Sequence, residues 1–358
     1  MKTDMSTFII AEAGVNHNGS LESAKQLIDA AADAGADAVK FQTFRADQLV
    51  ARHAPKAEYQ TLTTDPKESQ FEMIKKLELT EADHDVLIAY AKSKDIEFLS
   101  TPFDVTSLAL LTQRFGITTI KVSSGDITNA PFLLQIARVA KRVILSTGMS
   151  TLAEVEAALG VLAFGFLEPE ANPQRISFAE AFSSDAGQRA LHERVMLLHC
   201  TTEYPAPINE VNLRAMDTMA LAFGLPTGYS DHTQGVHIPV AAVARGAAII
   251  EKHFTLDRSL PGPDHKASLE PIELQTMVSA IRDVEQALGD GVKRPTATEL
   301  KNRSVARKSL VAERALLRGD KFVLACKRPG TGLSPFEYWR MVGQLSTKDY
   351  AADELLDA

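Results

Sequence analysis

Short, largely apolar runs recur along most of the chain, and longer amphipathic segments separate them. Eight of these runs are bounded by turn or polar residues, so we predict strands at 8–11, 38–41, 97–100, 119–122, 143–145, 196–200, 227–229 and 248–251. Between them, apolar residues recur at helical spacing, which predicts helices at 20–34, 81–93, 131–140, 151–162 and 271–288. An all-helical interpretation is weaker, because the runs are short and rich in β-branched residues. The chain therefore alternates strand and helix.

Eight strand-and-helix units favour a closed parallel (β/α)8 barrel over an open doubly wound sheet. An open sheet of that kind usually has fewer strands and a GxGxxG turn after the first one. Here the first strand runs into EAGVNHNG at 12–19, which is no such turn. The predicted fold class is therefore α/β, with a (β/α)8 TIM barrel as the main domain.

The alternation of strand and helix stops after Gly289, and this change places the domain boundary. We predict a catalytic barrel over 1–288, a linker over 289–302 and a small C-terminal domain over 303–358. A unit of about 55 residues is marginal as an independent fold, so we expect it to gain stability by docking on a barrel. The segment 165–194, rich in Pro, Ser, Glu and Asp, is predicted as a surface excursion.

Composition and charge exclude several kinds of partner. The hydrophobic fraction of 45% and the charged fraction of 23% are ordinary for a globular protein, and the net charge of -8 disfavours nucleic acid and anionic membranes. No stretch approaches the ~20 apolar residues of a membrane span, and residues 1–7 are too polar for a signal peptide. Cys200 and Cys326 are far apart and indicate neither a disulfide framework nor a zinc site. We expect a cytoplasmic protein.

Polar residues gather where the predicted strands end, which is the rim that carries the chemistry of (β/α)8 barrels. In chain order they are Glu12, Lys40, Gln42, Ser100, Thr101, Lys121, Ser124, Ser146, Thr147, Thr202, Tyr204, Ser230, His232, Glu251 and His253. Period-two alternation puts Lys40 and Gln42 on one face of their strand, and Glu251 and His253 on one face of theirs. Nearly every strand contributes to this rim.

Lys40 and Lys121 interrupt apolar strands, where a buried ammonium group is costly unless an anion pairs with it. One interpretation is a structural ion pair with Glu12 or Asp126. The other is that the two lysines hold the phosphate and the carboxylate of a doubly anionic ligand. The turns SSG at 123–125 and STG at 146–148 favour the second interpretation, because their hydroxyls, backbone N–H groups and helix N-termini are suited to anions.

His232 and His253 end consecutive strands, which are neighbours in a closed barrel, so both imidazoles could bind one divalent ion. Each stands beside a carboxylate, Asp231 or Glu251. The alternative is that each is a hydrogen-bonded core histidine. With two protein nitrogens, water and substrate oxygens would complete an open, catalytic metal site. His17, in the loop after the first strand, is either a turn residue or a substrate contact.

Eight stretches of the barrel resemble the sialic acid synthase family, in the same order and over nearly the whole chain. They are IAEAGVNHNG (10–19), VKFQTF (39–44), STPF (100–103), KVSSGD (121–126), STGM (146–149), GYSDHT (228–233), EKHF (251–254) and PGPDH (261–265). CKRPGTGLSP (326–335) resembles the antifreeze-like SAF domain, a β-clip fold, of the same family. The family includes synthases of N-acetylneuraminate, N,N'-diacetyllegionaminate and pseudaminate.

The resemblance implies a metal-dependent transferase that joins phosphoenolpyruvate to an N-acylated amino sugar through a carbon–carbon bond. The residues that match positions holding phosphoenolpyruvate are Lys40, Thr101, Lys121, Ser124, Ser146, Thr202 and Ser230. Those that match positions around the sugar are Glu12, Gln42, Asp126, Tyr204, Asp264 and Arg328, and the matching metal ligands are His232 and His253. Catalysis is expected from Glu12, Lys40, Lys121 and both histidines, with Glu12 or a metal-bound water as the proton acceptor. Manganese is the expected cation, with magnesium and cobalt as alternatives.

The resemblance also implies a domain-swapped homodimer, in which the small domain of one subunit covers the active site of its partner. Arg328 matches the arginine that reaches across toward the N-acyl group of the sugar. A catalytic site shared between subunits is therefore expected.

N-acetylneuraminate synthase, acting on N-acetylmannosamine, is the function we predict. Similarity at 126–134 and 150–162 to legionaminic acid synthases makes N,N'-diacetyllegionaminate synthase the alternative, with 2,4-diacetamido-2,4,6-trideoxymannose as its sugar. Asp126 and Thr202 stand where some members carry Glu and Asn, and the first difference bears on the sugar. A metal-dependent aldolase or sugar isomerase on the same barrel would not need the small domain. A carbohydrate-binding barrel without turnover is the non-catalytic alternative.

Overall fold

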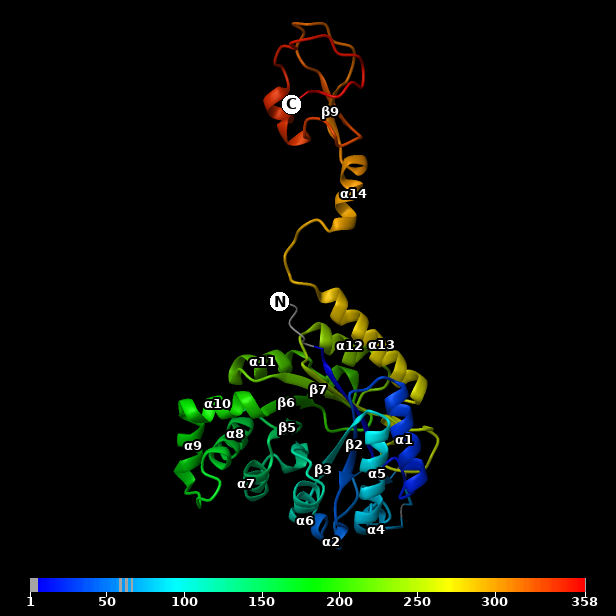
Figure 1. The fold of residues 1–358 in the computed structure, drawn as a ribbon, viewed down its shortest axis with the longest axis vertical. Helices are drawn as coiled ribbons and strands as arrows, with labels where there is room; N and C mark the ends of the chain where they lie inside the picture. Colours follow the sequence, from blue (N-terminus) through cyan, green and yellow to red (C-terminus); the bar gives the residue numbers. More distant parts are fainter. Residues whose placement is uncertain (1–5, 58–59, 62–63, 66, 358) are drawn as a thin grey trace. The chain divides into compact units, whose positions relative to one another are not determined.

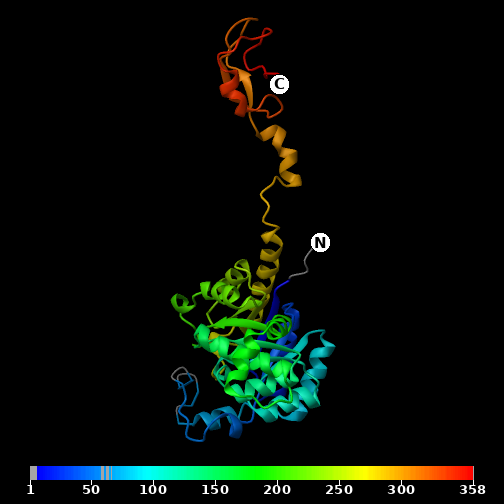
Figure 2. The ribbon, with the colours of Figure 1, turned by 90° about the vertical axis from the view of Figure 1, so that its left-hand side faces the viewer.

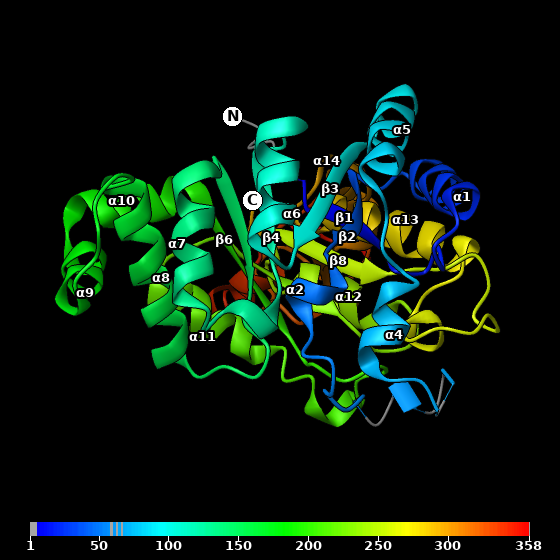
Figure 3. The same cartoon turned by 90° about the horizontal axis from the view of Figure 1, so that it is seen from below.

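The computed structural model describes residues 6–57, 60–61, 64–65 and 67–357, and the chain divides into two compact units, Met1–Leu288 and Gly289–Ala358. The strands of the first unit are β1 (Phe8–Gly14), β2 (Ala38–Thr43), β3 (Glu97–Pro102), β4 (Thr119–Val122), β5 (Arg142–Ser146), β6 (Val195–Cys200), β7 (Thr227–Asp231) and β8 (Ile249–His253). They pair in parallel in the order β3-β2-β1-β8-β7-β6-β5-β4. Because β3 also lies beside β4, the barrel is nearly closed (Figures 1 and 3). The predicted fold class and all eight predicted strands are confirmed.

Helices follow the strands and cover the outside of this barrel (Figure 3). They are α1 (Leu21–Asp33), α2 (Ala46–Leu49), α4 (Gln70–Lys75), α5 (Glu81–Ser93), α6 (Val105–Ala109), α7 (Ala130–Val139), α8 (Leu152–Leu167), α9 (Arg175–Ser183), α10 (Asp185–Arg194), α11 (Arg214–Phe223), α12 (His237–Ala244) and α13 (Pro271–Leu288). Each of the predicted helices is present, and α8 runs past its expected end at residue 162 to Leu167.

Helix α1 illustrates how the sequence specifies these elements. The hydroxyl of Ser20 accepts a hydrogen bond from the amide of Ser23 and so caps the first turn. The fully buried side chains recur three and four residues apart and share one face: Ala24, Leu27, Ile28 and Ala31. That face packs against outward-facing strand residues such as Val39, so local amphipathicity is sufficient to dock the helix on the barrel.

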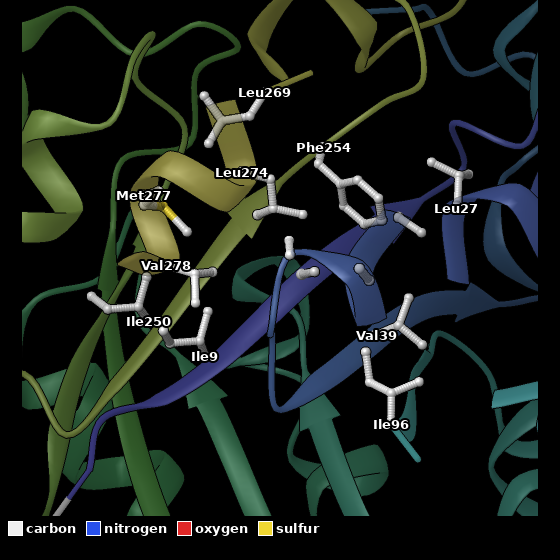
Figure 4. Close-up of a cluster of buried hydrophobic side chains, with 14 of the residues drawn as sticks. Ile9, Leu27, Val39, Ile96, Ile250, Phe254, Leu269, Leu274, Met277 and Val278 are labelled. Carbon is white, nitrogen blue, oxygen red and sulfur yellow. The ribbon is translucent and has the colours of Figure 1, made fainter. Parts of the chain in front are cut away.

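Period-two alternation divides the strand side chains between two apolar cores. Side chains of one parity fill the inside of the barrel: Ile10, Ala38, Leu99, Ile144, Leu198 and Ile249. Side chains of the other parity, such as Ile9 and Ile250, pack outward against Met277 and Val278 of α13 (Figure 4). Because the inner apolar layer lies toward the start of the strands, the interior near their C-terminal ends is left to polar residues.

The segment 165–194, predicted as a surface excursion, is helical. It forms α9 and α10, which both lie beside α8 (Figure 1). Ala181 and Leu191 are buried in the same apolar cluster as Leu159 of α8. These few apolar anchors are enough to dock two helices, although polar residues dominate the segment.

The second unit contains α14 (Ala297–Ala306), the antiparallel strands β9 (Ser309–Ala312) and β10 (Leu324–Lys327), and α15 (Tyr338–Met341). It has a small apolar core of its own: Leu310, Ala312, Leu316, Phe322, Leu324, Tyr350 and Leu356. Its identity as an antifreeze-like domain stays a prediction. Within the described parts of both units, no helix combines the length and the apolar character that crossing a membrane requires.

Candidate active site

A cavity of about 400 Å³ opens at the C-terminal ends of the barrel strands. Its polar lining comes from all eight strands and the loops that follow them: Glu12, Lys40, Gln42, Thr101, Lys121, Ser123, Ser124, Ser146, Cys200, Thr202, Tyr204, Ser230, His232, Glu251, His253 and Asp264. The parallel register aligns Glu12 with Lys40 on one side and with His253 on the other. Barrel closure thus gathers most of the residues predicted for the site, although they are far apart in the sequence.

Two carboxylates and two ammonium groups meet in this cavity. Lys40 Nζ lies 2.6 Å from Glu12 Oε2 and 3.5 Å from Glu251 Oε2, and Lys121 Nζ lies 3.4 Å from Glu251 Oε1. Burial raises the pKa of Glu12 to about 7, although Lys40 opposes the shift. Burial acts in the same direction on Glu251, but Lys121 and Lys40 outweigh it and hold the pKa of that carboxyl below its ordinary value. The cluster is a charge-balanced, poorly solvated centre.

The sequence places Glu251 beside the imidazole pair as a neighbouring carboxylate but does not predict its pairing with the two lysines. Glu251 bridges both lysines and also accepts a hydrogen bond from Ser230 Oγ at 2.9 Å. The available signal was an acidic residue in an apolar strand, two positions before His253 and on the same face. Its partners could not be read from the sequence, because Lys40 and Lys121 come from strands elsewhere in the barrel.

The two imidazoles lie side by side at the ends of β7 and β8. The ring centroids of His232 and His253 are 5.2 Å apart. His232 Nδ1 lies 2.6 Å from the carbonyl oxygen of Thr201, to which it donates, so Nε2 is left unprotonated. His253 Nδ1 is buried without a hydrogen-bond partner, 3.6 Å from Asp264 Oδ2. Burial lowers the pKa of His232 to about 4 and that of His253 well below its ordinary value, so both rings are neutral at pH 7.

These features fit a divalent cation. Neutral imidazole is a good ligand for a divalent transition metal, and the unpaired Nδ1 of His253 is a buried polar atom that requires a partner. Among the described residues, no three His, Cys, Asp or Glu side chains form a complete metal-binding group. His232 and His253 would supply two nitrogens and leave the remaining positions to water and substrate.

Hydroxyl and thiol groups cluster around Gly148 at the end of β5. The amide of Gly148 donates to Ser124 Oγ at 3.0 Å, and the same oxygen lies 3.1 Å from Cys200 Sγ. A β-carbon at position 148 would collide with the Thr202 and Ser124 hydroxyls and with Cys200 Sγ, so a larger residue would displace this cluster. Ser146 Oγ is buried without a hydrogen-bond partner. The cluster brings together the turns at 123–125 and 146–148, where the sequence predicts anion binding. The binding of an anion there stays a prediction.

Most barrel residues predicted around the sugar line the cavity: Glu12, Gln42, Tyr204 and Asp264. The ring of Tyr204 stacks on His232, with centroids 4.2 Å apart. Burial raises the pKa of Asp264 to about 6. A carboxyl and an aromatic ring therefore lie directly beside the imidazole pair.

Two predicted sugar residues lie elsewhere in the described structure. Asp126 is absent from the cavity lining, because the 3-10 turn Ser124–Asp126 carries it past the strand end, where it accepts a hydrogen bond from Asn129 Nδ2 at 3.2 Å. Arg328 belongs to the second unit, where its Nε donates to the carbonyl oxygen of Ala306 at 3.0 Å. Their roles toward the sugar stay predictions.

Asp231 does not support the metal site as its position next to His232 suggested. Its Oδ2 lies 2.6 Å from Lys252 Nζ, and both side chains are fully buried. Alternation along β7 directs His232 into the cavity and Asp231 to the outside of the barrel. His17 is buried and its Nδ1 accepts the amide of Gly19 at 3.0 Å, as a turn residue would. It is absent from the cavity lining, and a contact with substrate stays a prediction.

A nearly closed (β/α)8 barrel with a charged cavity at the C-terminal ends of its strands defines a barrel enzyme. Residues 27–293 match the NeuB family, and the chain belongs to this family. The predicted family and the predicted enzyme class, a phosphoenolpyruvate-dependent transferase that forms a carbon–carbon bond, are confirmed.

Relatives of this chain are similar over nearly its whole length. The N,N'-diacetyllegionaminic acid synthase of Campylobacter jejuni is 49% identical over 353 residues, which cover 98% of both chains. The synthase of the same name from Legionella pneumophila is 45% identical over 357 residues, covering 99% of this chain and 94% of its own. The crystal structure of N-acetylneuraminic acid synthetase from Leptospira borgpetersenii has a TM-score of 0.65 and 34% identity, and the match covers 83% of this chain and 90% of that one. These identities favour the alternative predicted function over the main one.

Proposed function

We propose that the protein is an N,N'-diacetyllegionaminate synthase. It condenses phosphoenolpyruvate with 2,4-diacetamido-2,4,6-trideoxymannose and water, and it releases phosphate. The observation that carries this proposal is one cavity with two lysines, a hydroxyl cluster and two neutral imidazoles, in a chain 49% identical to a synthase of that name over 98% of its length. N-acetylneuraminate synthesis from N-acetylmannosamine is the second candidate, supported by the similarity to the Leptospira enzyme.

Phosphoenolpyruvate would bind at the floor of the cavity. Its phosphate and carboxylate provide the negative charge that Lys40 and Lys121 otherwise obtain from Glu12 and Glu251. The hydroxyls at the strand ends would complete the anion site: Thr101, Ser124, Ser146, Thr202 and Ser230. Fixing both anionic groups holds the enol carbon next to the sugar, so that the reactants meet as neighbours.

The reaction begins when C3 of phosphoenolpyruvate attacks the aldehyde carbon of the open-chain sugar. The aldehyde oxygen gains a proton, and C2, now cationic, adds water, which gives up a proton. Loss of phosphate from C2 then leaves the keto group of the product. With a pKa of about 7, Glu12 can take up the proton from water at neutral pH. Its position beside Lys40, on the strand next to that of His253, supports this role.

A divalent cation, with manganese the expected ion, would be held by His232 and His253. When bound, it would polarise the aldehyde oxygen of the sugar. The hydrogen bond from His232 to Thr201 fixes the ring so that its Nε2 remains available. The stacked ring of Tyr204 restricts the same imidazole.

Phosphate release provides the test of this function. Phosphate should appear from phosphoenolpyruvate only when an amino sugar is present, with a higher kcat/KM for the trideoxy sugar than for N-acetylmannosamine. A chelator should abolish release, and manganese should restore it. Mass spectrometry of the product identifies the nonulosonic acid. Phosphate release without sugar, or sugar cleavage without phosphoenolpyruvate, would instead support another barrel chemistry, and binding without product would support the non-catalytic alternative.

We further propose that the second unit is an antifreeze-like domain that completes the partner's active site in a domain-swapped homodimer. Its exposed Arg328 would reach the N-acyl group of the sugar. The two cysteines, which form no disulfide, support a cytoplasmic location.

Arg328→Ala should raise the KM for the sugar about tenfold or more and leave the KM for phosphoenolpyruvate nearly unchanged, because only a charged hydrogen bond to the sugar is lost. Arg314→Ala, at another exposed arginine of the same unit, is the matched control. Mixing Arg328→Ala with a barrel-inactive His232→Ala variant should restore up to about a quarter of the activity in a swapped dimer. Equal loss for both substrates, or no restoration on mixing, would argue against this role.

A further inference from the structure

The active-site cavity has an apolar side as well as a charged floor. Val15 and Leu77 line it, and five further side chains form what we call the apolar wall: Phe44, Leu49, Met73, Ile74 and Phe103. They come from the end of α2, from α4 and from the segments after β2 and β3. Helices α2 and α4 lie side by side, and Figure 2 shows their segment, in blue, projecting from the barrel beyond the strands. The anion site does not require these residues, since its lysines and hydroxyls lie at the strand ends.

The side chains of the apolar wall pack on one another and on neighbouring apolar residues, and the wall is therefore part of the folded barrel. The rings of Phe44 and Phe103 meet edge to face with centroids 6.2 Å apart. Val15 and Leu77 belong to the same buried cluster. A capping box between Ser69 and Glu72 begins α4, which sets the position of Met73 and Ile74. Leu49, Ile74 and Phe103 remain only partly covered and thus available to a ligand.

An apolar wall suits methyl groups and disfavours hydroxyl groups. A hydroxyl placed against it loses its hydrogen bonds to water without replacement, whereas a methyl group gains from burial. N-acetylmannosamine carries hydroxyls at C4 and C6 and a single methyl group. The 2,4-diacetamido-2,4,6-trideoxy sugar carries a methyl group at C6 and a second acetamido group at C4. Gln70, three and four residues before Met73 and Ile74 in α4, also lines the cavity, and its amide matches the polar part of an acetamido group.

We propose that the apolar wall is the specificity element of this enzyme, which selects a 6-deoxy, 4-acetamido sugar by packing its C6 methyl and its C4 acetamido methyl. This inference rests on the proposed function and adds to it the residues that choose between the two candidate sugars. Leu49 and Ile74 are the wall residues best placed for substitution, because they are only partly buried and lie in short surface helices.

The closing experiment measures kcat/KM for three sugars at saturating phosphoenolpyruvate: the trideoxy sugar, its 6-hydroxy analogue and N-acetylmannosamine. The wild-type enzyme should prefer the trideoxy sugar to the 6-hydroxy analogue by about tenfold or more, as expected for one methyl group in an apolar pocket. Leu49→Asn and Ile74→Asn should each lower kcat/KM for the trideoxy sugar about tenfold and change that for N-acetylmannosamine less than about threefold. The KM for phosphoenolpyruvate should not change.

Leu221→Asn, at an exposed leucine of α11 outside the cavity, is the matched control, and Leu49→Met and Ile74→Leu should keep wild-type selectivity. Circular dichroism establishes whether each variant folds. If a variant does not fold, the comparison of the three sugars with the wild-type enzyme still tests the inference. The specificity role of the apolar wall would be overturned, and the proposed function would not, by either of two results. One is equal wild-type use of the trideoxy sugar and its 6-hydroxy analogue; the other is an equal loss with all sugars in the folded variants. Wild-type enzyme that uses no sugar with phosphoenolpyruvate would refute the function on which it rests.

Discussion

His232→Ala is expected to lower phosphate release about 10³-fold or more and to leave the fold intact. The imidazole is one of two neutral rings whose centroids lie 5.2 Å apart, and its Nδ1 is committed to the carbonyl oxygen of Thr201. Alanine removes the remaining nitrogen, so His253 alone would have to hold the cation. The loss should appear in kcat with saturating substrates, because the cation acts on the reacting aldehyde.

Metal binding and structure must be measured beside activity in this variant. Titration with manganese, followed by electron paramagnetic resonance, should show one bound ion per wild-type chain and greatly weakened binding in His232→Ala. Circular dichroism should be unchanged. His237→Ala, at an exposed histidine that begins α12, serves as the control and should keep both binding and turnover. Retained turnover in His232→Ala, or undiminished manganese binding, would remove the metal role assigned to this residue.

Lys252→Met should lower the free energy of unfolding by about 3–5 kcal/mol, the cost of leaving a buried charge without its partner. Lys252 and Asp231 are both fully buried, with Nζ and Oδ2 2.6 Å apart. Nζ also donates to the carbonyl oxygen of Thr233. Methionine removes both hydrogen bonds and leaves the buried Asp231 carboxylate with donors from Thr233 but without a cation. The pair lies on the outside of β7 and β8, and the substitution therefore tests the stability of the barrel separately from its chemistry.

Urea denaturation followed by circular dichroism measures this effect as a shift of the midpoint at unchanged slope. Lys92→Met, at an exposed lysine of α5, is the matched control and should change the free energy of unfolding by no more than about 0.5 kcal/mol. A midpoint in Lys252→Met as high as that of the control would show that the buried pair contributes little to stability.

Local patterns were sufficient to predict the barrel and the rim of the site. Strands that alternate with helices indicate parallel pairing, and parallel pairing brings the strand ends to one rim. The sequence therefore places Lys40, Lys121, His232 and His253 at one rim, and all four line one cavity. The helices α9 and α10 escaped prediction, because their few apolar anchors stand in a segment dominated by polar residues.

The sequence patterns do not predict which side chains pair between distant strands. Glu251 bridges two lysines from other strands, and Asp231 pairs with Lys252 instead of supporting the imidazoles. The apolar wall likewise depends on how α2 and α4 pack over the rim. Alternation along a strand is a local property, so the chain alone shows which residues share a face. Which side chains meet across the barrel depends on strand register and on closure, and only the folded structure determines these.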